Sequence, residues 1–153
     1  MITMKNTIQT EMEQLAEYYK NWYGKLGIKS GSLQTVLVSE LIHLARDHGY
    51  IAVAEYVVEN VPPFGRSGRL DLVWINRDTG DIAYAFEIDR GIKEKSIQKL
   101  LHVRRNFPNA KIYIVSCGTK LSNFSLIKQK YLSYTACDIK HIDVTDRTLS
   151  ELI

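Results

Sequence analysis

The chain has 153 residues, of which 45% are hydrophobic and 24% charged, and its formal net charge at pH 7 is +3. This length suits one domain with a single core, and the composition is typical of a folded globular protein rather than a disordered one. No apolar run approaches the ~18 residues that a membrane span requires, and the N-terminus does not read as a secretory signal. Cys117 and Cys137 have no metal-ligand spacing, so the sequence predicts neither a zinc site nor a disulfide framework, and we expect a cytoplasmic protein with no membrane partner.

Two helices are predicted before the first strand. Residues 10–26 place Met12, Leu15 and Tyr19 at three- and four-residue spacing, which is typical of an amphipathic helix. That helix either packs on the core or offers an aromatic surface for a second copy of the chain or for nucleic acid. The second helix is predicted over residues 33–47, with Ser32 as its N-terminal cap and Gly49 after its end.

Three strands follow these helices. Residues 50–60 are almost wholly apolar and β-branched, which predicts a strand covered on both faces. Residues 61–68 are rich in turn formers and predict a loop. Residues 69–76 and 82–89 then form the strongest hairpin signal in the chain, because the segment between them contains Asp-Thr-Gly.

The rest of the chain alternates helices and strands. Ile97, Leu100 and Leu101 lie on one stripe of a helix that Pro108 stops. The predicted elements are a helix over 92–107, a strand over 110–118, a helix near 122–131, a strand over 138–144 and a short helix from Asp146 or Thr148. We therefore expect one α/β domain over residues 1–153 with a mixed sheet flanked by helices. It comprises an N-terminal helical extension (1–30), a core (33–117) and a C-terminal addition (118–153).

The hairpin predicts a cluster of acids. A three-residue loop with Gly80 in the left-handed conformation would pair Arg77 with Asp81, so that the numbers of paired residues sum to 158. Asp71 then lies opposite Glu87, and directly opposed residues point to the same side of a sheet. Asp89 shares that side, because alternate residues of a strand do. Three carboxylates would therefore meet at the open end of the hairpin.

Two interpretations of this cluster stay open on geometry alone. Like charges in contact repel, and a hard divalent cation such as Mg²⁺ or Mn²⁺ would neutralise them with the oxygen ligands it prefers. Alternatively, Arg69 pairs with Asp89 and the other acids are solvated. Basic residues flank the acids, which fits a polyanion bound beside a cation; they are Arg66, Arg69, Arg90, Lys93, Lys95, Lys99, Arg104 and Arg105.

The order of elements around these acids resembles the PD-(D/E)XK nuclease superfamily over roughly residues 33–117. The matching segments are the helix "LQTVLVSELIHLARDHGY", the strands "IAVAEYVVE", "GRLDLVW" and "YAFEIDRG", the helix "KSIQKLLHVRR" and the strand "KIYIVS". The resemblance implies a restriction-endonuclease-like fold with core order α-β-β-β-α-β. It also implies that Asp71 and Glu87 hold Mg²⁺ or Mn²⁺, with Glu40 on the first core helix as a further metal ligand.

The sequence departs from this family at one position. The family's lysine lies two residues after the glutamate, where this chain has Asp89, which leaves Asp89 as a further metal ligand. Some members carry the lysine on the following helix, where Lys95 and Lys99 are the candidates and Gln98 is an alternative contact. Glu55, on the preceding strand, lies either buried near the site or at an exposed edge.

The resemblance implies a magnesium-dependent deoxyribonuclease, with endonuclease action expected. Asp71, Glu87, Asp89, Lys95 and Lys99 are the expected catalytic residues, and Arg66, Arg69, Arg90 and Lys93 would bind DNA phosphates. A homodimer is a possible assembly for action on two strands. The alternatives are an inactive nucleic-acid-binding or protein-interaction module on the same fold, and a structural subunit of a larger assembly.

Overall fold

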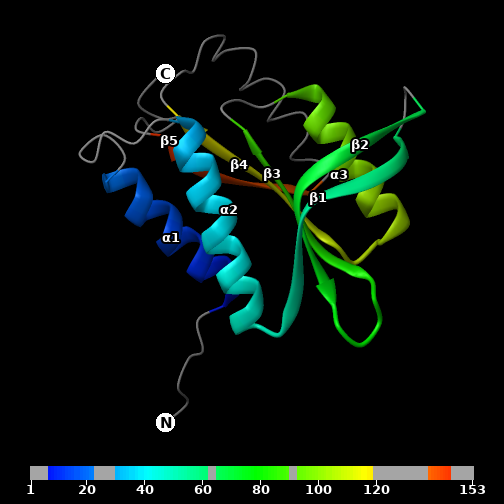
Figure 1. The fold of residues 1–153 in the computed structure, drawn as a ribbon, viewed down its shortest axis with the longest axis horizontal. Helices are drawn as coiled ribbons and strands as arrows, with labels where there is room; N and C mark the ends of the chain where they lie inside the picture. The colour runs from blue at the N-terminus through cyan, green and yellow to red at the C-terminus, as the bar shows by residue number, and fades with distance from the viewer. Residues whose placement is uncertain (1–6, 23–29, 62–64, 90–92, 119–137, 146–153) are drawn as a thin grey trace.

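The computed structural model describes residues 7–22, 30–61, 65–89, 93–118 and 138–145. In chain order the elements are α1 (Ile8–Trp22), α2 (Ser30–Asp47), β1 (Tyr50–Val61), β2 (Arg66–Asn76), β3 (Ile82–Asp89), α3 (Glu94–Asn106), β4 (Lys111–Gly118) and β5 (Ile139–Thr145) (Figure 1). The helices expected near residues 122–131 and after residue 146 lie outside the described residues. No helix in the described ranges is long and apolar enough to cross a membrane.

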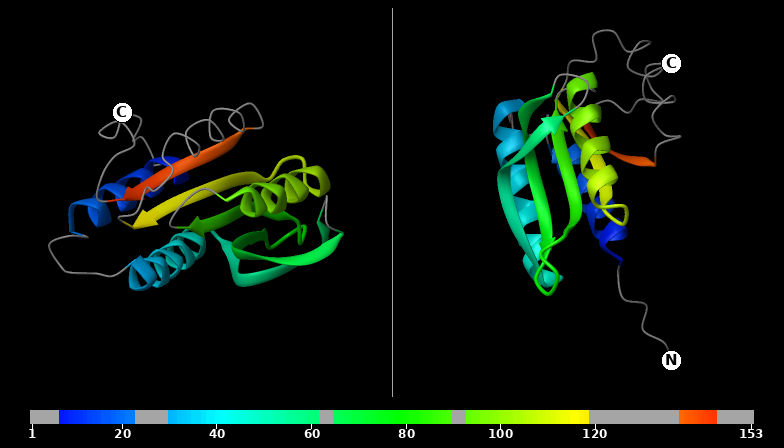
Figure 2. Two further views of the ribbon diagram at one scale, coloured as in Figure 1. Left: turned by 90° about the horizontal axis from the view of Figure 1, so that it is seen from above. Right: turned by 90° about the vertical axis from the view of Figure 1, so that its right-hand side faces the viewer.

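The five strands form one mixed sheet in the order β1-β2-β3-β4-β5. β1, β2 and β3 are antiparallel neighbours, whereas β3, β4 and β5 are parallel. Helices α1 and α2 pack on one face and α3 on the other (Figure 2). Phe86 belongs to the core under α1 and α2, and Ala85 to the core under α3. The predicted α/β class with a mixed sheet flanked by helices is confirmed.

Two element boundaries differ from the sequence expectations. Helix α2 begins at Ser30, so Ser32 lies inside the helix and is not its cap. Strand β2 begins at Arg66, so residues 66–68, which were expected in a loop, pair with the end of β1. Glycine and serine are poor strand formers on their own, and here the pairing partner decides their conformation.

Strand β1 is not covered on both faces as its sequence predicted. It lies at the edge of the sheet, and Ile51 and Val57 are 45% and 53% exposed. An apolar composition is typical of a central strand, but it does not specify a strand's place in the sheet. Glu55, near the middle of β1, has a positive φ of 51°, and β1 bends strongly along its length (Figure 1).

The hairpin between β2 and β3 has a longer loop than predicted. Asn76 donates its N–H to the carbonyl of Asp81 and accepts from the N–H of Gly80, so four residues form the loop and Asn76, not Arg77, faces Asp81. Gly80 has the expected positive φ of 76°. A bulge at Ala83 then shifts the register by one residue, since Trp74 pairs with Tyr84 but Ile75 pairs with Ile82.

This bulge restores the predicted register toward the open end of the hairpin. Leu72 pairs with Phe86 and Val73 with Ala85, as a sum of 158 requires. It also turns Ile82 to the α3 face, whereas strict alternation had placed it on the face of Tyr84. The error in loop length and the unforeseen bulge cancel, so the part of the hairpin that carries the acids has the expected pairing.

Helix α1 packs on the core. Met12 and Ala16 are buried in the cluster that contains α2 and the sheet, and the Tyr113 hydroxyl donates to Gln9 at 2.6 Å. Tyr18 is 58% exposed on the other side of the helix. The structure therefore supports the interpretation in which this amphipathic helix covers one face of the sheet.

The ring of Phe86 anchors the aromatic part of this core, and its loss should be costly. It is fully buried, with ring centroids 5.0 Å from Trp74 and 5.4 Å from Tyr113. We expect Phe86→Ala to lower the free energy of unfolding by about 3–5 kcal/mol through the cavity it leaves, measured by urea denaturation. Val57→Ala, at an exposed edge position, should cost less than about 1 kcal/mol; equal losses would contradict this packing.

Candidate functional site

The candidate site lies where β2 and β3 separate. The backbone pairing of the two strands ends at Leu72 and Phe86. Beyond this point, side-chain carboxylates accept the hydrogen bonds of the backbone N–H groups. The N–H of Ile88 donates to Asp71 Oδ2 at 2.6 Å, and the N–H of Asp71 donates to Glu87 Oε2 at 3.2 Å. Each acid therefore accepts a hydrogen bond from the opposite strand, and Asp71 and Glu87 lie close together as the register predicted.

The bend of β1 takes part in this arrangement. Ala54 pairs with Leu72 and Tyr56 with Leu70, so Glu55 and Asp71 are opposite each other between those pairs. Leu70 packs in the core under α3, whereas Leu72 packs under α1 and α2. The side chains of β2 thus change faces at Asp71, beside the left-handed residue of β1.

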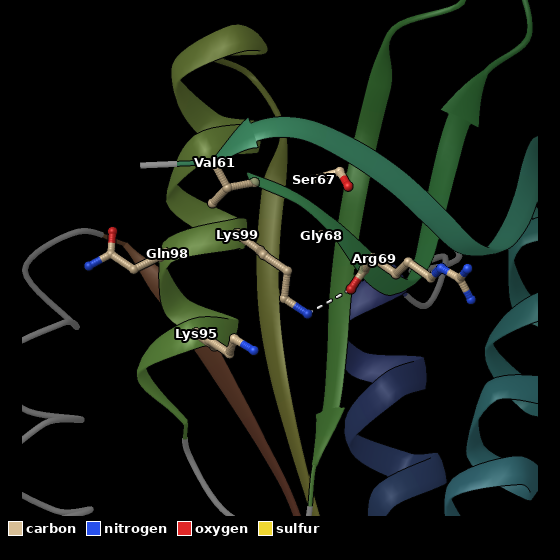
Figure 3. Close-up of a pocket in the computed structure, with 7 residues that line it drawn as sticks. All are labelled: Val61, Ser67, Gly68, Arg69, Lys95, Gln98 and Lys99. Atoms are coloured by element: carbon tan, nitrogen blue, oxygen red, sulfur yellow. Dashed lines mark hydrogen bonds between the residues drawn. The ribbon is translucent and has the colours of Figure 1, made fainter. Parts of the chain in front are cut away.

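Lys99 of α3 contacts Glu87 of the acid pair. Its Nζ forms an ion pair with Glu87 Oε1 and donates a hydrogen bond to the carbonyl of Arg69 at 2.6 Å (Figure 3). Both side chains are largely removed from solvent, at 21% exposed for Lys99 and 2% for Glu87. Sequence reasoning left Lys95 and Lys99 as alternatives, and the structure brings Lys99 to the acids.

Glu87 has an unusual protonation equilibrium. Burial, then hydrogen bonding to Asp71 and the charge of Asp71, raise its pKa from 4.5 to about 8, although Lys99 acts in the opposite direction. Desolvation disfavours a buried carboxylate, and a neighbouring carboxylate disfavours it further. The pair therefore favours an additional positive charge, which either a proton or a metal ion supplies.

Asp89 lies at the same end of the hairpin but is held by α3. Its Oδ2 accepts a hydrogen bond from Ser96 Oγ at 2.6 Å, and Lys93 Nζ lies 4.0 Å from its Oδ1. Burial is the largest cause of its raised pKa, and the Asp71 charge also raises it. The alternative ion pair from Arg69 to Asp89 does not form; Arg69 Nη1 instead lies 4.0 Å from Glu55 Oε2, with both side chains exposed.

The chemistry of the acid pair fits a small divalent cation. In the part of the chain that the structure describes, no group of three or more His, Cys, Asp or Glu side chains is arranged to hold a metal. Asp71 and Glu87 supply hard carboxylate oxygens, and the burial that raises the pKa of Glu87 also favours a positive charge beside it. Mg²⁺ is commonly bound by one or two carboxylates together with substrate phosphates and water, so two acids are enough.

Helix α2 approaches the site through a residue that the sequence did not single out. Gln34 Nε2 donates to the carbonyl of Ile88 at 2.7 Å. Glu40, the expected helix ligand, accepts a hydrogen bond from the Tyr19 hydroxyl at 3.0 Å. Nothing in the periodicity of α2 distinguishes a glutamine near its first turns from other polar residues there.

A polar row continues from Asp89 across the parallel strands. Asp89 is in register with Ser116, and Ser116 with Asp143. Ser116 is 3% exposed and its Oγ lies 2.7 Å from His141 Nε2. Burial lowers the pKa of His141, which favours a neutral imidazole at pH 7.

The basic residues that the sequence singled out differ in where they lie. Arg69, Lys95 and Lys99 line one cavity, and Lys93 is exposed near Asp89. The side chain of Arg66, and Arg90 altogether, lie outside the described residues. Gln98, the alternative helix contact, also lines the cavity (Figure 3).

Gly68 leaves the space through which Lys99 passes. A Cβ at Gly68 would lie 2.9 Å from Lys99 Cδ and 3.4 Å from Lys99 Cγ, closer than carbon atoms pack without displacement. Gly68 had been grouped with the turn formers of the preceding loop. A glycine inside a strand often marks a close approach by another group, and this signal could have identified it.

No protein-family model, curated protein or solved structure matches this chain.

The protonation of Glu87 should make stability depend on pH. A carboxyl whose folded-state pKa is raised stabilises the fold below its unfolded pKa and loses that contribution as pH rises through the folded value. We therefore expect the free energy of unfolding to fall between about pH 4.5 and about pH 8, by at most about 1.4 kcal/mol per pH unit from this group. Glu87→Gln should flatten the profile in urea denaturation, and an unchanged slope would contradict the raised pKa.

Gly68→Ala should affect stability only through Lys99. Gly68 does not have a positive φ, so alanine is compatible with its backbone and should stabilise slightly by reducing unfolded-chain entropy, by about 0.4–1 kcal/mol. In the native chain the clash should outweigh this gain. We expect Gly68→Ala to destabilise the native chain but not the Lys99→Ala variant, with a coupling of about 1 kcal/mol in a double-mutant cycle. Equal effects in both backgrounds would show that Gly68 does not position Lys99.

Proposed function

We propose that this protein is a divalent-cation-dependent nuclease that hydrolyses phosphodiester bonds of DNA. The observation that carries the proposal is the meeting of three groups from different elements: Asp71 of β2, Glu87 of β3 and Lys99 of α3. Two adjoining carboxylates beside a partly buried ammonium can hold a cation and stabilise negative charge next to it. This set also agrees with the nuclease family that the sequence resembles.

In this proposal the protein groups have distinct tasks. Asp71 and Glu87 hold Mg²⁺ or Mn²⁺, which when bound polarises a phosphate and lowers the pKa of a water. Lys99, whose Nζ lies against Glu87, donates a hydrogen bond to the phosphate and stabilises the charge that develops on it. Ser96 orients Asp89 through its hydroxyl, and the exposed Lys93 lies 4.0 Å from Asp89.

The backbone contacts explain why the acids are well suited to this task. Each carboxylate accepts a hydrogen bond from the opposite strand, so its position is determined by the sheet rather than by a flexible loop. A site built on strands holds its groups more closely than one built on loops. Asp71 and Glu87 thus meet a cation with little rearrangement.

A second candidate function is a nucleic-acid-binding module without catalysis. It is favoured by the ion pair between Lys99 and Glu87, which already neutralises one acid without a metal, and by the partners of Asp89, which are Ser96 and Lys93. In that case the acids would serve to position β2, β3 and α3. Binding without metal-dependent cleavage would support this alternative.

Cleavage of circular and linear DNA tests the proposal. We expect cleavage with Mg²⁺ or Mn²⁺ and none with chelator, because the acids alone do not activate water. Asp71→Asn and Glu87→Gln should each lower the rate by at least about a hundredfold, and Lys99→Met by a similar factor. Asp81→Asn, at an exposed acid of the same hairpin, should retain the native rate.

Two outcomes would overturn the nuclease proposal. Cleavage that persists in Asp71→Asn or Glu87→Gln would show that the activity arises elsewhere or from a contaminant. DNA binding without cleavage under any of the metal conditions would favour the non-catalytic module. Circular dichroism of each variant should match that of the native chain, so that loss of activity is not loss of fold.

A further inference from the structure

A cavity of about 420 Å³ is lined in part by Lys99, the residue that pairs with Glu87. Its walls come from α3 on one side and from the paired ends of β1 and β2 on the other (Figure 3). The cationic side chains of Lys95 and Lys99 line it, together with the polar Ser67 and Gln98, and none of its described lining residues is acidic. Arg69 borders the cavity with its backbone and directs its guanidinium away from α3 (Figure 3), where it lies 4.0 Å from Glu55. A concave site with only positive charges concentrates anions.

The size of the cavity restricts the ligand. Small-ligand sites typically measure about 300–1,000 Å³, and this cavity is near the lower end of that range. It suits one nucleotide rather than a base pair. Val61 adds an apolar surface to the basic lining, which would pack against a sugar or a base while the cations bind phosphate.

Lys99 belongs to both the cavity and the acid pair. Its side chain lines the cavity, whereas its Nζ pairs with Glu87 and with the carbonyl of Arg69. In this arrangement Lys99 neutralises Glu87, and its charge is only partly available to an anion. A divalent cation on Asp71 and Glu87 would replace Lys99 as the partner of Glu87, and the ammonium would then be available to the cavity.

We propose that this cavity binds one nucleotide of the substrate strand through its phosphate, and that Lys99 couples this binding to cation binding at Asp71 and Glu87. The inference rests on the proposed function for the identity of the ligand. The coupling arises because the two ligands bind the two members of one ion pair. The metal cation binds the Glu87 carboxylate, and the phosphate binds the Lys99 ammonium. Coupling between two binding sites is reciprocal, so each ligand strengthens binding of the other.

Titration calorimetry with thymidine 3′,5′-bisphosphate tests the proposal without cleavage, because this probe has no internucleotide bond. Without metal, Lys95→Met should weaken binding by about tenfold, as expected for loss of a charged contact. Arg105→Met, at an exposed cation of α3 away from the cavity, should not change it. Inorganic phosphate should bind more weakly than the bisphosphate, and equal affinity would overturn the nucleotide assignment.

The same titration with Mg²⁺ tests the coupling. Lys99→Met should abolish most of the gain that Mg²⁺ gives the native chain, because the ammonium is fully available to the cavity only when a cation has replaced it at Glu87. Since Mg²⁺ also binds phosphate in solution, the native chain and Lys99→Met are compared at the same metal concentrations. An equal gain in both would overturn the coupling, and unchanged affinity in Lys95→Met would overturn the cavity site.

These results are separable from the cleavage assay. A chain that cuts no DNA but binds the bisphosphate with the expected variant pattern would contradict the nuclease proposal and leave the cavity as a nucleotide site. A chain that cuts DNA but whose Lys95→Met variant binds the bisphosphate equally well would retain the proposed function and contradict this inference.

Discussion

The structure of the site depends on how the chain satisfies its backbone where β2 and β3 part. A buried N–H without an acceptor is costly, and the ladder offers none beyond Leu72 and Phe86. The Asp71 and Glu87 carboxylates supply the missing acceptors across the gap. The same contacts bring two acids together in a poorly solvated place, which raises the pKa of Glu87. Structural and chemical roles are therefore carried by the same oxygen atoms.

Helix α3 completes the site because its core packing sets its rotation. Ile97, Leu100 and Val103 are buried under the sheet, and this orientation places Ser96 and Lys99 toward the strand ends. The lysine that meets Glu87 therefore comes from α3 and not from β3. Its reach depends on the bare backbone of Gly68. A substitution among the buried residues of α3 would therefore move Ser96 and Lys99 relative to the acids.

Some of this was predictable from the sequence, for identifiable physical reasons. The bounds of β3 followed from alternation, which is a local rule. The predicted pairing around Asp71 and Glu87 is right only because the longer loop and the bulge at Ala83 offset each other. The choice between Lys95 and Lys99 depended on where α3 sits against the sheet, which no local rule gives. The contact of Gln34 with Ile88 depends on how α2 packs, and the apolar composition of β1 did not indicate that it lies at the sheet edge. Local periodicity determines which face of a helix or strand a side chain occupies, whereas tertiary packing determines which side chains of other elements it contacts.

The bulge at Ala83 has a consequence for how this hairpin can vary. Between the loop and the acids, one extra residue is accommodated on β3, so the geometry of the loop end is not transmitted unchanged to the open end. The sequence and length of the turn around Asp78 and Thr79 can therefore change without shifting the pairing at the open end of the hairpin. We therefore expect a tag or probe inserted in this turn to leave the pairing of β2 and β3 near Asp71 and Glu87 unchanged.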